Sequence, residues 1–217
     1  MSSGVTMAKA DRTYGQYCPI AAGLDVVGDR WVLLICRELL MGDRRFTDLR
    51  AALPGIAPNL LTERLRALQA EGLVTTAELP PPAARAVYRL TESGRSVVPV
   101  LRAMARFGVQ FLDGEPGAPL TARRAAHALL MPWRKPVAAK LRARLVVGPR
   151  DEVDLVLDGT DTAIVAAEGA ADVTLDATPA DLVRARQEGG QLQGRLAGGS
   201  RQQRLLLEAF NLQLATS

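Results

Sequence analysis

The feature that most constrains this sequence is the stretch from Arg44 to Glu71, where apolar residues recur at helical spacing on both sides of a short turn. The turn is Pro54–Pro58, and Pro58 suits the first turn of the following helix, where its missing N–H costs nothing. Two short helices joined by a tight turn form a helix-turn-helix unit, whose second helix can lie in a DNA major groove. The apolar positions are Phe46, Leu49 and Leu53 in the first helix and Leu61, Leu65 and Leu68 in the second.

Length and composition narrow the class of protein. With 217 residues, 48% of them hydrophobic, the chain is long enough for two domains with real cores. We expect no membrane insertion and no signal peptide, because the apolar runs are short and the first residues lack the charged-then-apolar pattern. The two cysteines, Cys18 and Cys36, and the single histidine, His127, favour a reducing, cytoplasmic setting without a structural metal site.

The chain is basic, with a formal net charge of +4. Its 27 lysines and arginines include lysine only at positions 9, 135 and 140, so arginine dominates. Arginine favours bidentate contacts with phosphate and with guanine edges. The chain is also rich in Ala, Leu and Gly, however, so genome composition explains the bias equally well. The charge by itself does not decide between the two explanations.

The segment after the helix-turn-helix predicts a hairpin and a long helix. Gly72 takes the usual glycine position past a helix C-terminus. Residues 73–79 and 86–90 are typical of two short strands, and the proline-rich tip 80–85 between them cannot continue the ladder. A hairpin in this place is the wing of a winged helix. The long helix that follows has more apolar surface than one small domain needs, which favours a dimer interface, and its apolar face is Val98, Leu101, Met104, Ala105, Val109 and Leu112.

Residues 14–111 closely resemble the HxlR-type branch of the MarR-like winged-helix regulators. The resemblance implies a homodimeric bacterial transcription regulator, each subunit of which places one recognition helix in the major groove of a near-palindromic double-stranded DNA operator. It is specific because many spaced positions hold in order. These are Cys18-Pro19-Ile20, Gly28-Asp29-Arg30-Trp31, Arg37-Glu38-Leu39, Arg45-Phe46, Leu53-Pro54-Gly55-Ile56, Leu61-Thr62-Glu63-Arg64-Leu65, Gly72-Leu73-Val74 and Tyr88-Arg89-Leu90-Thr91-Glu92-Ser93-Gly94.

Helical geometry selects the side chains that would meet DNA, because the leucines of the second helix face inward. Asn59 can read adenine, and Arg66 can read guanine or bind phosphate. Thr62 can contact a phosphate or a thymine methyl group. Glu63 can accept a hydrogen bond from cytosine, or instead hold a neighbouring arginine. Arg64 lies on the flank of the face, where reaching a phosphate and bracing the domain internally are equally reasonable.

Residues around the second helix extend this predicted interface. Arg44 and Arg45 precede the first helix of the motif and are candidates for phosphate positioning. Arg85, at the wing tip, can enter the minor groove or touch the backbone. Ala57 takes the N-cap position and lacks a capping oxygen, so the free N–H groups that follow Pro58 in the first turn can meet a DNA phosphate.

The cysteines offer an alternative mode of control. Cys18 aligns with the cysteine that some relatives of the resembled family use as a thiol sensor. The neighbouring charges give no clear reason for a lowered pKa, so plain packing competes with a redox role. Cys36 lies between apolar positions of a helix and is interpreted as a core residue.

The pattern breaks at 113–119, which we interpret as a linker. Beyond it, helical spacing covers 122–131, strands are predicted at 141–147, 153–157, 162–166 and 173–176, and helices are predicted from 178 and over 201–214. Asp158-Gly159 is a hairpin signal. No phosphate-binding glycine loop, nucleophile motif or metal-ligand spacing occurs, and His127 stands alone in the sequence, so we expect neither an enzyme nor a cofactor.

The second half, about 120–214, resembles sterol-carrier-protein-like domains, in which a sheet and helices enclose an apolar tunnel. The loop run Gly194–Ser200 departs from that family, which affects the size and openness of the tunnel. The resemblance implies a hydrophobic small-molecule effector; the candidate lining residues can equally be plain core. The resemblance rests on Asp172–Ala177, Asp181-Leu182, Gly194-Arg195-Leu196 and Leu205-Leu206, and the candidate lining residues are Trp133, Leu145, Leu155, Leu157, Leu206 and Phe210.

Taken together, the sequence predicts an α+β chain. It comprises a disordered N-terminal arm at 1–13, a winged-helix DNA-binding and dimerisation domain at 14–112, a linker at 113–119 and a sterol-carrier-like domain with a small antiparallel sheet at 120–217. The predicted function is a dimeric, ligand-responsive DNA-binding regulator, most simply a repressor. Two alternatives are a thiol-based redox regulator that senses through Cys18 and a lipid carrier or accessory protein that does not bind DNA.

Overall fold

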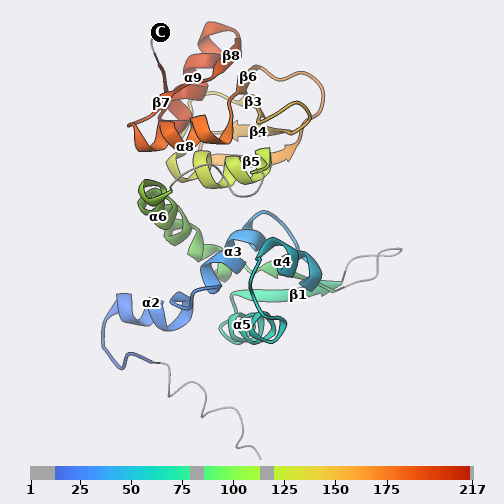
Figure 1. The fold of residues 1–217 in the computed structure, drawn as a ribbon, viewed down its shortest axis with the longest axis vertical. Coiled ribbons are helices and arrows are strands. Elements are labelled where there is room, and N and C mark those ends of the chain that lie inside the picture. The colour runs from blue at the N-terminus through green and yellow to red at the C-terminus, as the bar shows by residue number, and fades with distance from the viewer. Residues whose placement is uncertain (1–12, 79–85, 113–119, 216–217) are drawn as a thin grey trace, which may run out of the picture. The chain divides into compact units, whose positions relative to one another are not determined.

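The computed structural model describes residues 13–78, 86–112 and 120–215 (Figure 1). The chain divides into two compact units, with the boundary between Pro99 and Val100. Each unit has its own core and is described separately below.

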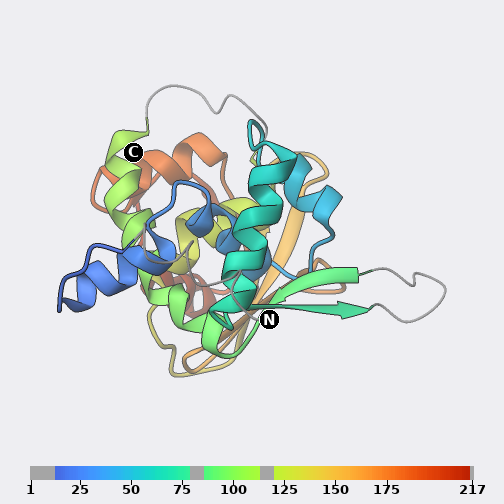
Figure 2. The same cartoon turned by 90° about the horizontal axis from the view of Figure 1, so that it is seen from below.

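The first unit contains the predicted helix-turn-helix and the two strands of the predicted wing. Strands β1 and β2 pair antiparallel, with Val74 opposite Leu90, and lie side by side in Figure 2. The predicted hairpin tip lies outside the described residues. The elements of this unit are α2 (Pro19–Val27), α3 (Val32–Leu40), α4 (Phe46–Ala52), α5 (Pro58–Ala70), β1 (Val74–Glu78), β2 (Ala86–Leu90) and the 3₁₀ turn η1 (Ser93–Val97).

The core of the first unit follows the predicted apolar spacing. Leu49 of α4 and Leu61, Leu65 and Leu68 of α5 are almost completely buried, together with Ile35 of α3. Burial of this stripe is the main force that holds the two helices of the motif against α3.

The end of α5 is set by a glycine, as the sequence predicts. Gly72 has φ +70°, a left-handed conformation that costs glycine little. Its N–H donates to the carbonyl of Gln69, and the N–H of Leu73 donates to the carbonyl of Leu68. This pair of bonds is the Schellman arrangement, and it turns the chain directly into β1.

The second unit is built on a five-stranded sheet in the order β5-β4-β3-β6-β8, in which β3 and β6 are parallel and the other pairs antiparallel. Helix α6 begins just before the unit boundary. The elements are α6 (Val98–Gly108), η2 (Val109–Phe111), α7 (Ala122–Ala125), the π-helical η3 (Ala126–Leu130), η4 (Met131–Trp133), β3 (Leu141–Val146), β4 (Glu152–Asp158), β5 (Asp161–Ala166), β6 (Val173–Asp176), α8 (Pro179–Gln187), β7 (Gln191–Leu192), β8 (Arg195–Gly198), α9 (Ser200–Phe210) and β9 (Gln213–Leu214).

Two local expectations in this unit are wrong. The run Gly194–Ser200 is not simply a loop, because Arg195–Gly198 forms β8 and pairs with β6 at the edge of the sheet. The final helix ends at Phe210 rather than at Leu214. Asn211 takes the left-handed conformation, with φ 51°, and the chain then pairs with β7 as β9. Asparagine tolerates this conformation better than most residues, which explains the early stop.

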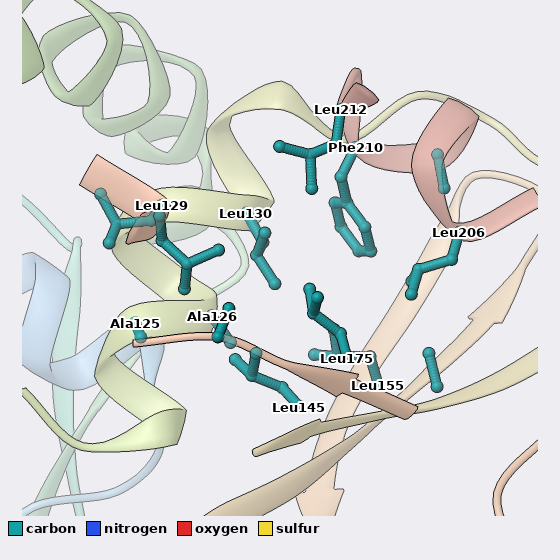
Figure 3. Close-up of a cluster of buried hydrophobic side chains, with 14 of the residues drawn as sticks. Ala125, Ala126, Leu129, Leu130, Leu145, Leu155, Leu175, Leu206, Phe210 and Leu212 are labelled. Carbon is teal, nitrogen blue, oxygen red and sulfur yellow. The ribbon is translucent and has the colours of Figure 1, made fainter. Parts of the chain in front are cut away.

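The core of the second unit lies between one face of the sheet and its helices (Figure 3). Leu145, Leu155 and Leu175 point from the strands toward Leu206 and Phe210 of α9. Ala125, Ala126, Leu129 and Leu130 close the cluster from the α7–η3 segment, where winding changes from α-helical to π-helical within one continuous stretch.

Candidate nucleic-acid interface

Helix α5 begins without a side-chain cap, as the sequence predicts. Ala57 is the N-cap in an extended conformation, and Pro58 takes the first helical position. The exposed start of the helix therefore presents backbone N–H groups that no side chain of the cap satisfies. These groups, together with the positive end of the helix dipole, are suited to an anion.

The outward face of α5 carries the polar residues that helical geometry selects. Asn59, Glu63 and Arg66 are exposed, whereas the three leucines of the helix are buried. Thr62 is half-buried, and its hydroxyl donates to the carbonyl of Pro58 at 3.0 Å. Its oxygen can still accept a hydrogen bond, although its proton is already used within the helix.

Arg64 takes the internal one of the two roles that the sequence left open. Its side chain is buried and forms ion pairs with Asp29 at 2.7 Å and with Glu63 at 2.9 Å. The hydrogen bond from Arg64 to Asp29 is the main cause that raises the pKa of the guanidinium. Arg64 thus ties α5 to the α2–α3 connection, and Glu63 takes the alternative role of holding a neighbouring arginine.

The predicted phosphate-positioning arginines lie beside the wing strands. Arg44 is half-buried, and its backbone exchanges two hydrogen bonds with Tyr88 of β2, at 3.0 and 2.7 Å. Arg45 is the N-cap of α4, and its N–H donates to Asp48 at 3.0 Å. Arg85 lies outside the described residues.

The candidate ligand-lining residues of the second unit belong to its packed core. Five of them, Leu145, Leu155, Leu157, Leu206 and Phe210, have at most 1% of their surface exposed. Trp133 differs, because it is half-buried and packs at the margin of the cluster. A surface pocket of about 390 Å³ in this unit is lined by other residues, among them Lys135, Asn211 and Leu212.

Exposed apolar side chains are the feature that sequence reasoning described only in part. Helix α6 has no buried residue, although Val100, Met104, Phe107 and the following Phe111 recur at helical spacing and are 42–62% exposed. The rings of Phe107 and Phe111 pack edge to face with centroids 5.1 Å apart. The two phenylalanines were missed; the signal that finds them is their spacing from Val100 and Met104.

A second group of exposed apolar residues lies at the start of the first unit. Tyr17, Ile20 and Leu24 lie on or just before α2 and are 44% exposed or more. Ile20 and Leu24 are four residues apart and therefore lie on one side of this helix, and within the first unit neither is buried. Surfaces of this kind mark sites of interaction with another molecule.

The two cysteines have different surroundings. Cys18 is half-buried at the N-cap of α2, and Cys36 is fully buried in α3. Burial raises the pKa of the Cys36 thiol to about 11, so this side chain is an inert core residue, as predicted.

The parts of the chain that the structure describes hold no cluster of three or more potential metal ligands. Within the same parts, no helix is long and apolar enough to cross a bilayer.

The antiparallel β1–β2 pair after a helix-turn-helix defines the first unit as a winged helix-turn-helix. Residues 26–116 match the HxlR-like helix-turn-helix family. A regulator described as HTH-type from Synechocystis is 38% identical over 115 residues, which cover 85% of it and 52% of this chain. One from Bacillus subtilis is 34% identical, covering 92% of it and 45% of this chain. The protein belongs to the HxlR-like helix-turn-helix family.

A solved structure, the reduced form of the transcriptional regulator YodB from B. subtilis, is 30% identical. The similarity covers all of that chain and 46% of this one, with a TM-score of 0.40. The family match at residues 26–116 ends before the five-stranded sheet of the second unit begins.

Proposed function

We propose that this HxlR-type transcription regulator is a dimeric repressor that binds a near-palindromic operator through α5. The observation that carries the proposal is the exposed polar face of α5, held in a winged helix-turn-helix whose leucines are buried. A helix with this division of faces offers base-reading side chains to the major groove while its core keeps the motif rigid.

Within this proposal, each side chain has a defined task. Arg66 donates to guanine, and Asn59 forms a bidentate pair with adenine. Arg44 and Arg45 bind phosphates and fix the register of the protein on the duplex. Arg64 is excluded from direct contact, because its guanidinium is committed to Asp29. Arg85 is proposed to enter the minor groove or to touch the DNA backbone.

The proposed dimer forms through α6. Exposed Val100, Met104 and Phe107 of α6, followed by Phe111 of η2, continue over three helical turns. This is the pattern of a helix that packs against a partner helix. The exposed apolar residues of α2 offer a second copy a separate apolar surface in the first unit. Two recognition helices in one dimer then match two operator half-sites.

The second unit, in this proposal, is a sterol-carrier-like effector domain for a hydrophobic small molecule. Helices cover a mixed sheet with an apolar interior, which supports the proposal, and Trp133 is the one candidate lining residue that reaches the surface. Effector binding changes DNA affinity only if it favours one dimer state over another.

The experiment is a fluorescence-anisotropy titration of the full chain against DNA from its own upstream intergenic region, at physiological salt and with excess competitor DNA. Specific binding that one hydrophobic metabolite releases supports both halves of the proposal. Release only by an oxidant, lost in Cys18→Ser, moves the sensor to Cys18. Purely non-specific, salt-sensitive binding, also in a genome-wide selection, contradicts the proposal and favours the carrier alternative.

A further inference from the structure

Four arginines gather around one short segment of the second unit, Pro132–Arg134. Arg106 of α6 donates from Nη1 to the carbonyl of Pro132 at 3.0 Å. Arg186 of α8 lies 4.5 Å from the centroid of the Trp133 ring. Burial, and after it the positive charge of Arg102 of α6, lowers the pKa of Arg134. We call Arg102, Arg106, Arg134 and Arg186 the arginine cluster.

Four other arginines of this unit, unlike the arginine cluster, lie beside carboxylates. Arg142 and Arg144 share the buried carboxylate of Asp154, each with a bond of 2.8 Å. Arg184 and Arg195 lie near Asp181 and Asp176. Among residues 13–78, 86–112 and 120–215, by contrast, no carboxylate pairs with any member of the arginine cluster.

Two members of the cluster also have a buried nitrogen atom without a hydrogen-bond partner. Arg186 is only 8% exposed and donates to the carbonyls of Leu129 and Phe210, at 2.6 and 2.9 Å, yet its Nη2 has no acceptor. Arg134 donates to the carbonyl of Gly159 and to the hydroxyl of Thr162, both at 2.9 Å, yet its Nη1 has none.

Uncompensated buried donors and adjacent like charges both cost free energy. Burial lowers the pKa of Arg186 to about 10, and burial together with Arg102 lowers the pKa of Arg134. An oxyanion would offset such costs, since a guanidinium forms paired, charge-assisted bonds with carboxylate and phosphate.

We propose that the arginine cluster binds the oxyanion head, a carboxylate or a phosphate, of a small amphipathic ligand whose apolar part packs against Trp133. Trp133 is half-buried and lies over Arg186 at the margin of the apolar cluster, so its ring joins the charged group to apolar surface. Because Nη2 of Arg186 is buried and the Trp133 ring lies 4.5 Å from the Arg186 guanidinium, we expect the ligand to reach this nitrogen by displacing the Trp133 ring.

The position of the cluster gives this ligand a route to regulation, and only this step rests on the proposed function. Arg102 and Arg106 project from α6, the helix whose exposed apolar stripe forms the proposed dimer contact. An anion that pairs Arg102 with Arg134 changes how α6 is held in its own unit. The same ligand thereby favours one arrangement of the dimer over another.

The test is isothermal titration calorimetry of the full chain with decanoate, decyl phosphate and decanol. Arg102→Met is the decisive variant, because Arg102 forms no hydrogen bond or ion pair among the described residues and its loss should leave folding intact. Arg204→Met, an exposed position on α9, is the control with the same charge change. We expect decanoate or decyl phosphate to bind, decanol to bind about tenfold more weakly, and Arg102→Met to lose about tenfold in affinity while Arg204→Met keeps it.

Equal binding of decanol and the two anions, or equal affinity of Arg102→Met and Arg204→Met, overturns the proposal; binding of neither anion does so too. Thermal unfolding gives an independent reading: Arg102→Met without ligand should melt no lower than wild type, because it removes a like-charge contact. If that variant is unfolded, Arg102→Lys, which keeps the charge but not the fork, takes its place. These titrations contain no DNA. Ligand binding can therefore fail in a protein that binds its operator, and it can succeed in a protein that does not.

Discussion

Helices α6 and α9 are each 11 residues long and amphipathic, yet they differ in how far their apolar side chains are buried. Helix α9 buries Leu206, Ala209 and Phe210 against β3, β6 and β8. Helix α6 buries nothing along its length, and Phe107 remains 59% exposed. An apolar stripe in the sequence therefore predicts that a helix packs against something. It does not predict whether the contact is made within the same chain or with another molecule.

The largest effect is expected on the covered helix. Phe210→Ala removes a fully buried ring from the centre of the cluster and should lower the free energy of unfolding by about 3–5 kcal/mol. Urea denaturation followed by circular dichroism measures it. Met104→Ala on α6 is the matched control, measured at micromolar protein concentration. An equal loss of unfolding free energy in this variant would mean that the two helices do not differ in burial.

The next effect concerns association. Phe107→Glu places a charge in the exposed stripe of α6 and should weaken the proposed dimer by about 2–4 kcal/mol, because a central aromatic anchor is lost. Sedimentation velocity over a concentration series measures the dissociation constant. Arg204→Met, at an exposed position and with the same charge change of −1, controls for charge alone. A Phe107→Glu protein that remains as dimeric as wild type would remove α6 from the interface.

Arg64 and Arg66 of α5 allow the same comparison between a buried and an exposed side chain. Arg64→Met removes the ion pair between Arg64 and Asp29 and should cost the first unit about 1–3 kcal/mol in stability. The change is measured by thermal or urea unfolding, and Arg66→Met, at an exposed position, should leave stability nearly unchanged. Equal stability of the two variants would mean that the Arg64–Asp29 ion pair does not stabilise the first unit.

Arg66→Ala, conversely, should leave folding intact and weaken operator binding by about 1–3 kcal/mol, with relaxed preference at one base pair. Anisotropy titrations against the wild-type operator and its single-base variants measure both properties. Arg50→Ala, an exposed arginine on α4, serves as the charge-matched comparison. Loss of affinity that is uniform across all sequences would indicate a phosphate contact instead of base reading.

The smallest structural disturbance is expected from thiol chemistry. At pH 8 a thiol reagent should modify Cys18 quickly and Cys36 only after unfolding, since burial holds the pKa of Cys36 at about 11. Because the pKa of Cys36 is higher in the folded protein, the protonated thiol contributes to the free energy of unfolding. This contribution is fully present below pH 9.0 and is lost as the pH rises toward 11. Mass spectrometry of Cys18→Ser and Cys36→Ser proteins separates the two sites. Rapid labelling of Cys36 in the folded protein would contradict its burial.

Much of the first unit could be predicted because its signals are local. The leucine spacing of α5, Pro58 at its start and Gly72 at its end act within one or two turns of helix. The role of Arg64 could not be predicted, since its partner Asp29 is distant in sequence and only the fold brings them together.

The second unit shows the limit more clearly. Leucines that line a cavity and leucines that fill a core have the same alternation in sequence, so Leu145 and Leu155 could not be assigned to either. Strand β8 was missed because pairing with β6 at the sheet edge, rather than any strong propensity of Arg195–Gly198, makes it a strand. The arginine cluster could not be predicted, because α6, which holds Arg102 and Arg106, is distant in sequence from Arg134 and from Arg186 of α8.

The most direct test of the central claim is selection from a random DNA pool by the full-length wild-type protein and by Arg66→Ala, sequenced in parallel. The account predicts that wild type enriches a near-palindromic motif with two equal half-sites, and that Arg66→Ala loses preference at one position of each half-site. If neither protein enriches a motif, or if both enrich the same motif to the same extent, α5 is not the element that reads DNA in this protein.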